Sequence, residues 1–317
     1  MTNPYPYSLD NKRYQTWNYY GKTRFGKKIV KVPLDAGFTC PNRDGTKGYG
    51  GCAFCPSNGI NNFPVPRADD LLWQFESRAE VLRNKWPDGI YVPYFQSYSN
   101  TYAKTETLRK VYAPFAQNPD YPMVFLATRC DCLSEEVLDL LEEMFEGQEL
   151  WIEIGVQSSY DETLRAMRCG YTFETVRDVI TRIKTQHFRV SVHLINGLPG
   201  ETEDMMIENA RQIAKLGVDA VKFHALLILK DAALEKIHLD HPVPLLTLED
   251  YAQIVARQLE VLPPEMIVER IVSDAPEDEL IAPKWVIKKT VALNTIDRVL
   301  SQQNTYQGRL YVPSVHY

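Results

Sequence analysis

Residues 29–55 read IVKVPLDAGFTCPNRDGTKGYGGCAFC. The first six of these residues are mostly apolar and β-branched, which is typical of a buried strand. The loop that follows holds three cysteines, Cys40, Cys52 and Cys55. It also holds glycines, which lack a Cβ and let the backbone approach a bulky inorganic group closely: Gly45, Gly48, Gly50 and Gly51. A strand that leads into such a loop predicts a metal or iron–sulfur site just beyond the end of the strand.

From the residues alone, three explanations of these cysteines stay open. A cubane [4Fe–4S] cluster held by three thiolates leaves one iron without a protein ligand, and an open metal position supports chemistry. A structural zinc ion needs four ligands, and the nearest downstream histidine, His187, lies far along the chain. The third explanation is that the cysteines are reduced and bind no metal. The number and closeness of the thiols favour the cluster.

The rest of the chain repeats a strand-then-helix pattern. We expect strands at residues 29–34, 90–95, 123–128, 150–156, 189–195 and 218–227. Apolar residues at helical spacing lie between them and predict the intervening helices. Such alternation implies an α/β fold with parallel strands and right-handed crossovers. A flat sheet and a barrel both satisfy the pattern, and a partial (βα)6 TIM-like barrel suits the length.

The pattern changes after residue 227. Residues 247–250, TLED, are a capping-box sequence that predicts a helix to residue 261. A further strand is expected at 266–272, and a long last helix from 284 to about 301. We therefore expect an N-terminal arm over residues 1–30, the partial barrel over 31–240, and a helical C-terminal extension over 241–317 that packs on the barrel.

Composition places few limits on function. The chain has 317 residues, a formal net charge of −6, 44% hydrophobic residues and 24% charged residues, as in ordinary globular proteins. It has no apolar run near the roughly twenty residues that a membrane-spanning helix needs. The first residues, MTNPYP, lack the apolar core of a secretory signal, so the cysteines are expected to be reduced or metal-bound. We expect a cytoplasmic protein with no membrane partner.

The N-terminal arm combines cations with aromatic rings. Its basic residues, which outnumber the single acid Asp10, include Lys22, Arg24, Lys27 and Lys28. Cations neutralise phosphates and rings stack on bases in proteins that bind single-stranded nucleic acid. The alternative is that the arm packs across the bottom of the barrel with its lysines in water.

Three segments carry a resemblance to known proteins: residues 31–45, KVPLDAGFTCPNRDG; residues 94–102, YFQSYSNTY; and residues 193–202, HLINGLPGET. With the cysteine spacing C-x11-C-x2-C, the chain resembles the radical S-adenosylmethionine (SAM) superfamily. The long first gap is similar to the branch that contains the Elongator catalytic subunit, and more narrowly to the bacterial family that contains MnmL. One position departs from that family's pattern, since Cys130 stands where the family has proline.

The resemblance implies that Cys40, Cys52 and Cys55 hold a [4Fe–4S] cluster whose open iron binds SAM. It implies that Gln96 or Ser97 meets the methionine amino group, and that Arg168 grips the methionine carboxylate. Further residues would contact the rest of the cofactor: Glu153, Gln157, Ser158, Asn196 and Leu198. Glu153 and Gln157 share one face of a regular strand, so both are expected to point inward.

Each of these residues also has a structural explanation. The polar residues at 96–100 fit a turn, and Glu153 fits a buried ion pair with an arginine. His193 and His224 are placed where they would face substrate, but a lone histidine is more often a satisfied core residue. Arg129 and Asp131, after the third strand, are expected to make the site polar. Cys130, Cys132 and Cys169 have no cluster spacing and are expected to be buried as small hydrophobic residues.

The family relationship implies an enzyme that forms a 5′-deoxyadenosyl radical. Its implied substrate is the wobble uridine of tRNA, with conversion of 5-carboxymethylaminomethyluridine to 5-aminomethyluridine. It would also need a low-potential electron donor such as flavodoxin or ferredoxin. The alternatives are a radical SAM enzyme for a small metabolite or peptide, a non-catalytic iron–sulfur sensor, and a zinc-stabilised RNA-binding protein.

Overall fold

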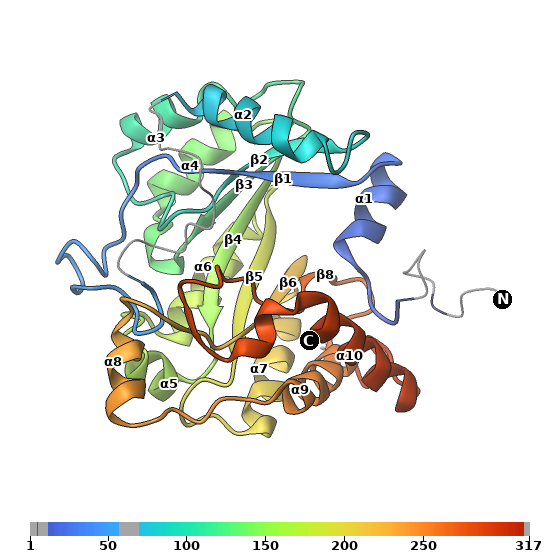
Figure 1. Ribbon diagram of the computed structural model, residues 1–317. Coiled ribbons are helices and arrows are strands. Elements are labelled where there is room, and N and C mark those ends of the chain that lie inside the picture. Colours follow the sequence, from blue (N-terminus) through green and yellow to red (C-terminus); the bar gives the residue numbers. More distant parts are fainter. Residues whose placement is uncertain (1–4, 6–11, 57–69, 314–317) are drawn as a thin grey trace.

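Seven parallel strands form one curled sheet, an open half-barrel, in the computed structural model, which describes residues 5, 12–56 and 70–313 (Figure 1). Their order across the sheet is β1-β2-β3-β4-β5-β6-β8. The bounds are β1 Ile29–Leu34, β2 Ile90–Phe95, β3 Met123–Thr128, β4 Glu149–Gln157, β5 Arg189–Asn196, β6 Ala220–Ala225 and β8 Ile267–Arg270. The predicted α/β half-barrel is confirmed.

The seventh strand comes from the C-terminal part of the chain. The six βα units expected from the sequence are present, and β8 then pairs in parallel with β6 through Ala220 and Ile267. The two residues that begin β8, Ile267 and Val268, are buried, so pairing covers an apolar segment that would otherwise face water. Residues 241–317 therefore contribute a strand to the sheet besides their helices, and part of this range, 314–317, lies outside the described residues.

The helices begin at polar caps that the sequence supplies. Side chains of Asp70, Ser134, Thr172 and Thr202 each accept a hydrogen bond from a backbone N–H in the first turn. The helices are α1 Trp17–Phe25, α2 Leu71–Arg83, α3 Thr105–Tyr112, α4 Glu135–Met144, α5 Asp161–Ala166, α6 Phe173–Ile183, α7 Glu203–Leu216, α8 Ala233–Asp240, α9 Leu248–Val261 and α10 Lys289–Gln302. None of the helices among the described residues is long and apolar enough to cross a membrane.

The last helix is shorter than expected. A short 3₁₀ helix, Lys284–Ile287, comes first, and Lys288 then takes a ψ of 58°, which is not helical. The chain therefore turns between the two segments, and α10 starts at Lys289. Two short antiparallel strands, β7 Ile228–Leu229 and β9 Leu280–Ala282, join this region to the end of β6.

The N-terminal arm lies across the amino ends of the strands. Trp17 packs edge-on against Phe125 and Trp151, with ring centroids 5.7 and 5.5 Å apart. The hydroxyl of Tyr20 donates to Glu149, the first residue of β4, at 3.1 Å. The aromatic residues of the arm therefore close the bottom of the barrel, as the packing alternative proposed. Residues 1–4 and 6–11 of the arm lie outside the described residues.

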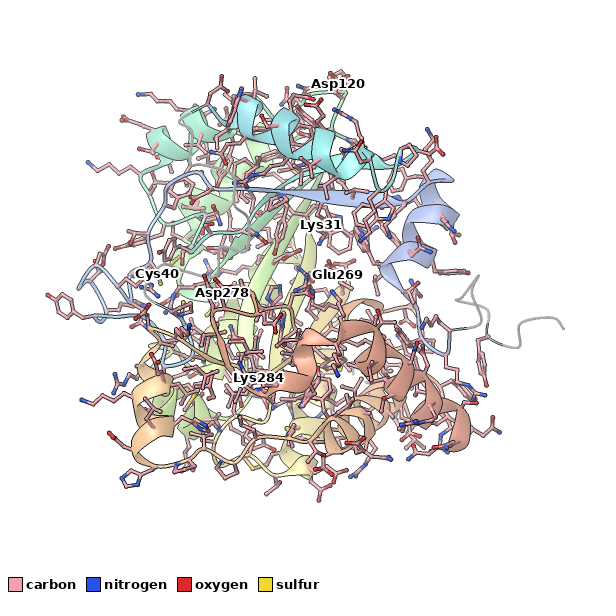
Figure 2. The ribbon with its side chains drawn as sticks, viewed as in Figure 1. Lys31, Cys40, Asp120, Glu269, Asp278 and Lys284 are labelled. Atoms are coloured by element: carbon pink, nitrogen blue, oxygen red, sulfur yellow. The ribbon has the colours of Figure 1, made fainter. Side chains whose placement is uncertain are left out.

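The position of four basic residues of the arm follows from this packing, and their contact with RNA stays a prediction. Lys22, Arg24, Lys27 and Lys28 precede the first residue of β1, whereas the cysteine loop follows its last residue. Arg24 forms an ion pair with Glu149, also at the amino end of the sheet. In Figure 1 the helix α1 lies at the right, and Figure 2 labels Cys40 at the left. The four cations thus lie at the opposite end of the sheet from the cysteines, because the rings beside them are needed to cover the barrel bottom.

Candidate active site

A cavity of about 260 Å³ opens at the carboxyl ends of the strands, below the cysteine loop. All three cysteines of the loop line it. The other lining residues come from most strands of the sheet and include Tyr94, Gln96, Tyr98, Arg129, Glu153, Gly155, Gln157, Tyr171, His193, Lys222, His224 and Arg270. The carboxyl ends of parallel strands are where half-barrels and barrels place their sites. The structure therefore brings nine of the predicted site residues together: Cys40, Cys52, Cys55, Gln96, Arg129, Glu153, Gln157, His193 and His224.

Side chains inside the loop donate toward its sulfurs. The amide of Asn42 lies 3.5 Å from the Sγ of Cys52 and also donates to the carbonyl of Arg168 at 2.5 Å. The guanidinium of Arg43 donates to the Sγ of Cys55 at 3.2 Å. Such donors stabilise thiolates and set the potential of a cluster that the thiolates bind. The same contacts anchor the loop to the body of the barrel.

The thiols of the loop differ in acidity. A hydrogen bond with the neighbouring Cys169, together with Arg129 and Asn42, lowers the pKa of Cys52 to about 7. Burial raises the pKa of Cys55, and Arg43 opposes that rise. Cys169 itself is fully buried, and its contact with Cys52 raises its own pKa, so it stays a neutral thiol. The predicted burial of Cys130, Cys132 and Cys169 is confirmed.

Gln157 reaches the cavity through an irregularity in β4. The register between β4 and β5 skips one residue between Gly155 and Gln157, and Gln157 has a φ of 67°. A Cβ at Gly155 would lie 2.4 Å from the side-chain nitrogen of Gln157, so this amide folds over the glycine. The bulge therefore turns Gln157 into the cavity, and a side chain at residue 155 would displace the Gln157 amide from its present position.

Glu153 is the centre of a buried network of donors below the cavity. One carboxylate oxygen accepts from Lys31 at 2.5 Å, and the other accepts from Lys222 at 2.6 Å and from the hydroxyl of Tyr94 at 2.7 Å. His193 lies 3.2 Å from the same oxygen. A carboxylate has about four lone-pair sites, so these donors nearly fill its capacity. A contact between Glu153 and the cofactor, which the resemblance implies, would have to share this carboxylate with the four groups already around it.

A second carboxylate completes the network. Glu269 on β8 pairs with Lys31 (Figure 2). It also lies 3.8 Å from Lys222, so two acids face two lysines. Lys31 also lies 3.7 Å from the ring centroid of Phe125. Burial by itself raises the pKa of Glu153, but Lys222 and Lys31 lower it well below its ordinary value. Burial lowers the pKa of Lys222, and Glu153 opposes this. The expected ion pair of Glu153 is thus made with lysines.

Arg129 and Asp131 form a bidentate pair at the end of β3. Arg129 Nε and Nη2 each lie 2.8 Å from a carboxylate oxygen of Asp131, and Nη2 also donates to the carbonyl of Cys169 at 2.8 Å. Lys47 of the cysteine loop pairs with Asp131 at 2.7 Å. Burial alone would raise the pKa of Asp131, but Arg129 and Lys47 lower it below its ordinary value. Arg129 lines the cavity, and Asp131 acts through it.

Several predicted cofactor contacts lie elsewhere. Arg168 is exposed and does not line the cavity. The amide of Asn196 exchanges two hydrogen bonds of 2.8 Å with Gln258 on α9. The hydroxyl of Ser158 bonds to Glu201. Leu198 and Ser97 are buried outside the cavity lining. Contacts of these five residues with a cofactor stay predictions, and the side chains of Asn196 and Ser158 already have structural partners.

The cavity also contains residues that the sequence did not single out. They include Arg43, Tyr94, Lys222 and Arg270. Asn42, which donates to the sulfur of Cys52, is a further such residue, although it does not line the cavity. Lys222 carried a usable signal, since a lysine in the middle of an otherwise apolar strand must find an acid inside the protein. Arg270 gave no such signal, because β8 was not assigned to the sheet.

Models of two protein families match the chain. That of the radical SAM superfamily covers residues 40–213, and that of the radical SAM C-terminal domain covers residues 218–302. The chain belongs to the radical SAM superfamily. In this radical SAM protein, the match to the superfamily model begins at Cys40 of the cysteine loop. Strands β6 and β8 lie within the match to the C-terminal domain model.

Three proteins show how far the similarity extends. Uncharacterized protein YtqA of Bacillus subtilis is 40% identical over 311 residues, which cover 98% of this chain and 97% of YtqA. A tRNA-2-methylthio-N(6)-dimethylallyladenosine synthase of Dehalococcoides mccartyi is 29% identical over 99 residues, or 31% of this chain and 23% of the synthase. The archaeal Methanocaldococcus infernus Elp3 superposes with a TM-score of 0.66 at 14% identity, over 89% of this chain and 64% of the Elp3 chain. The last comparison establishes a shared fold.

Radical SAM proteins bind a [4Fe–4S] cluster and SAM, and these are the cofactors of this chain. The donor set fits, because three thiols line one cavity and side chains donate to two of the sulfurs. Within residues 12–56 and 70–313, no group of three or more histidine, cysteine or acidic side chains is arranged to hold a single metal ion. Cys40, Cys52 and Cys55 would hold the cluster, which supplies the electron that cleaves SAM when both are bound.

Proposed function

We propose that this radical SAM enzyme acts on the wobble uridine of tRNA and converts 5-carboxymethylaminomethyluridine to 5-aminomethyluridine. The observation that carries the proposal is the lining of one cavity, in which the three cysteines meet His193, His224 and Arg270. Basic and imidazole groups suit a small substrate group that bears a carboxylate. The part-match to a tRNA-modifying enzyme supports a tRNA substrate.

The size of the cavity supports a nucleotide drawn out of its stack. The cavity of about 260 Å³ and a neighbouring one of about 410 Å³ suit a single base and its substituent, but not a helix. Enzymes that act on a base commonly extrude it into such a pocket, and a wobble base is already single-stranded. The residues of the protein would bind and orient this base and keep water away from the reacting carbon, while the cofactors supply the radical chemistry.

The direct test is the nucleoside content of tRNA from a strain that lacks the gene. We expect 5-carboxymethylaminomethyluridine to accumulate and 5-aminomethyluridine and its derivatives to fall. Purified protein, reconstituted without oxygen and given SAM, a reductant and this tRNA, should reverse the change. If the nucleosides of the deletion strain are unchanged, the substrate is instead a small metabolite or peptide. A flavodoxin or ferredoxin is the electron donor that we propose in the cell.

The arm is expected to contribute little to recognition of the anticodon. Lys22 and Lys27 are exposed at the amino end of the sheet, away from the cavity. Each lost phosphate contact lowers the slope of affinity against salt concentration by about 1. The double variant K22A/K27A should lose no such contact, so it should bind an anticodon stem-loop with an unchanged salt slope. If the salt slope measured by fluorescence titration falls by about 2, Lys22 and Lys27 both contact phosphates, and the arm is part of the RNA-binding surface.

A further inference from the structure

A second cavity, of about 410 Å³, adjoins the first. The two share six lining residues, Phe54, Gln96, Gln157, His193, His224 and Arg270. None of the three cysteines lines the second cavity. Most of its remaining walls are apolar and come from the segment after β6, with Leu226, Leu227 and Leu229, and from Ala275 and Pro276. A chamber with apolar walls beside the cofactor cavity suits a flat ring.

Arg270 is a cation of the second cavity whose guanidinium has N–H donors available for a ligand. It ends β8, lines both cavities, and lies 3.2 Å from the carboxylate of Asp274. Its guanidinium makes no hydrogen bond with the residues that the structure describes, although arginine has five N–H donors. The other cations of the first cavity are engaged: Lys222 by Glu153, Arg129 by Asp131, and Arg43 by Cys55.

His224 supplies the second observation. Its Nε2 is buried and has no hydrogen-bond partner among the described residues, and the ring lies 5.2 Å from that of His193. A buried nitrogen without a partner destabilises the fold unless a ligand satisfies it. His224 and Arg270 line the same two cavities, so one ligand in the shared region can reach both. The pair therefore indicates an anionic group rather than a purely apolar one.

We propose that Arg270 and His224 form the carboxylate subsite that gives this enzyme its substrate specificity. Given the function proposed above, the ligand is the carboxylate of the carboxymethyl unit, with the uracil ring against the leucines of the second cavity. Arg270 is suited to this task because its planar fork can bind both carboxylate oxygens. The subsite distinguishes substrate from product, since the product lacks the carboxylate.

The test compares two anticodon stem-loops that differ only at the wobble position, one with 5-carboxymethylaminomethyluridine and one with 5-aminomethyluridine. Their dissociation constants are measured with reconstituted protein and SAM, for the wild type, Arg270→Gln and the matched control Arg257→Gln. Arg257 is a half-buried arginine on α9, outside both cavities, that pairs with Glu203 and Asp204. R270Q should weaken binding of the first stem-loop by about tenfold to a hundredfold, as for loss of a charged hydrogen bond. Binding of the second should change less than about threefold, and R257Q should alter neither.

Other results overturn the proposal in distinguishable ways. An equal loss for both stem-loops would mean that Arg270 contacts the RNA backbone or only supports the fold. Weaker binding of SAM alone would assign Arg270 to the cofactor. If the wild type binds neither stem-loop, the tRNA proposal fails, and the two free nucleosides then test the subsite separately. A preference for the carboxylate-bearing nucleoside that R270Q abolishes would support the subsite, and no preference would reject it.

Discussion

Replacing any one of Cys40, Cys52 and Cys55 with alanine is expected to abolish formation of 5′-deoxyadenosine. All three thiols line the cavity, and a cluster with an open iron has no protein ligand to spare. Members of one catalytic unit fail together, so each variant should lose activity by about 10³-fold or more. Iron content after oxygen-free reconstitution, and 5′-deoxyadenosine formed with dithionite and SAM, measure the two effects.

Two other cysteines provide the controls. Cys130 is fully buried, and burial raises its pKa to about 12, so it is a neutral thiol. C130A should keep the iron and the SAM cleavage of the wild type. C169A is the sharper control, because Cys169 contacts Cys52 and would be the fourth thiolate of a closed cluster. Retained activity in C169A agrees with an open iron; loss of iron in C169A, with activity kept in one of the three loop variants, would contradict the assignment.

Local sequence predicted the strands because their signals are local. Residues 90–95 and 123–128 are apolar runs bounded by turns, and both boundaries match the structure. The seventh strand was harder to place, since β8 is only four residues long and its pairing with β6 depends on where α9 ends. The cysteine ligands were predictable for the same reason as the strands, because they lie within one short loop.

Contacts between distant residues could not be predicted. The sequence placed Glu153 inside the barrel, but its lysine partners lie on β1 and β6, 122 and 69 residues away. Asn196 was expected just after the fifth strand and is instead the last residue of β5, where Gln258 on α9 satisfies its amide. Composition also did not reveal that rings of the arm, such as Trp17, cover the barrel bottom. In each example, tertiary packing decides what a side chain meets.

Glu153→Gln is expected to destabilise the protein by about 3–5 kcal/mol, the usual cost of breaking a buried ion pair. The carboxylate of Glu153 is fully buried and accepts from Lys31, Lys222 and Tyr94. A neutral amide leaves two buried lysines facing only Glu269. Urea unfolding followed by circular dichroism measures the change. The matched control is Glu143→Gln, since Glu143 pairs at 2.7 Å with Arg109 on the exposed surface; this change should cost less than about 1 kcal/mol.

The pH dependence of this difference identifies its cause. Because the pKa of Glu153 in the folded protein lies well below the ordinary value of 4.5, its charge stabilises the fold fully above pH 4.5. That contribution is lost as the pH falls through the lower folded value. The gap in stability between wild type and E153Q should therefore be constant from pH 7 to about 5 and narrow below about 4.5. A gap that stays the same at acid pH would mean that E153Q acts through packing or hydrogen bonds, and that the lysines around residue 153 do not need its charge.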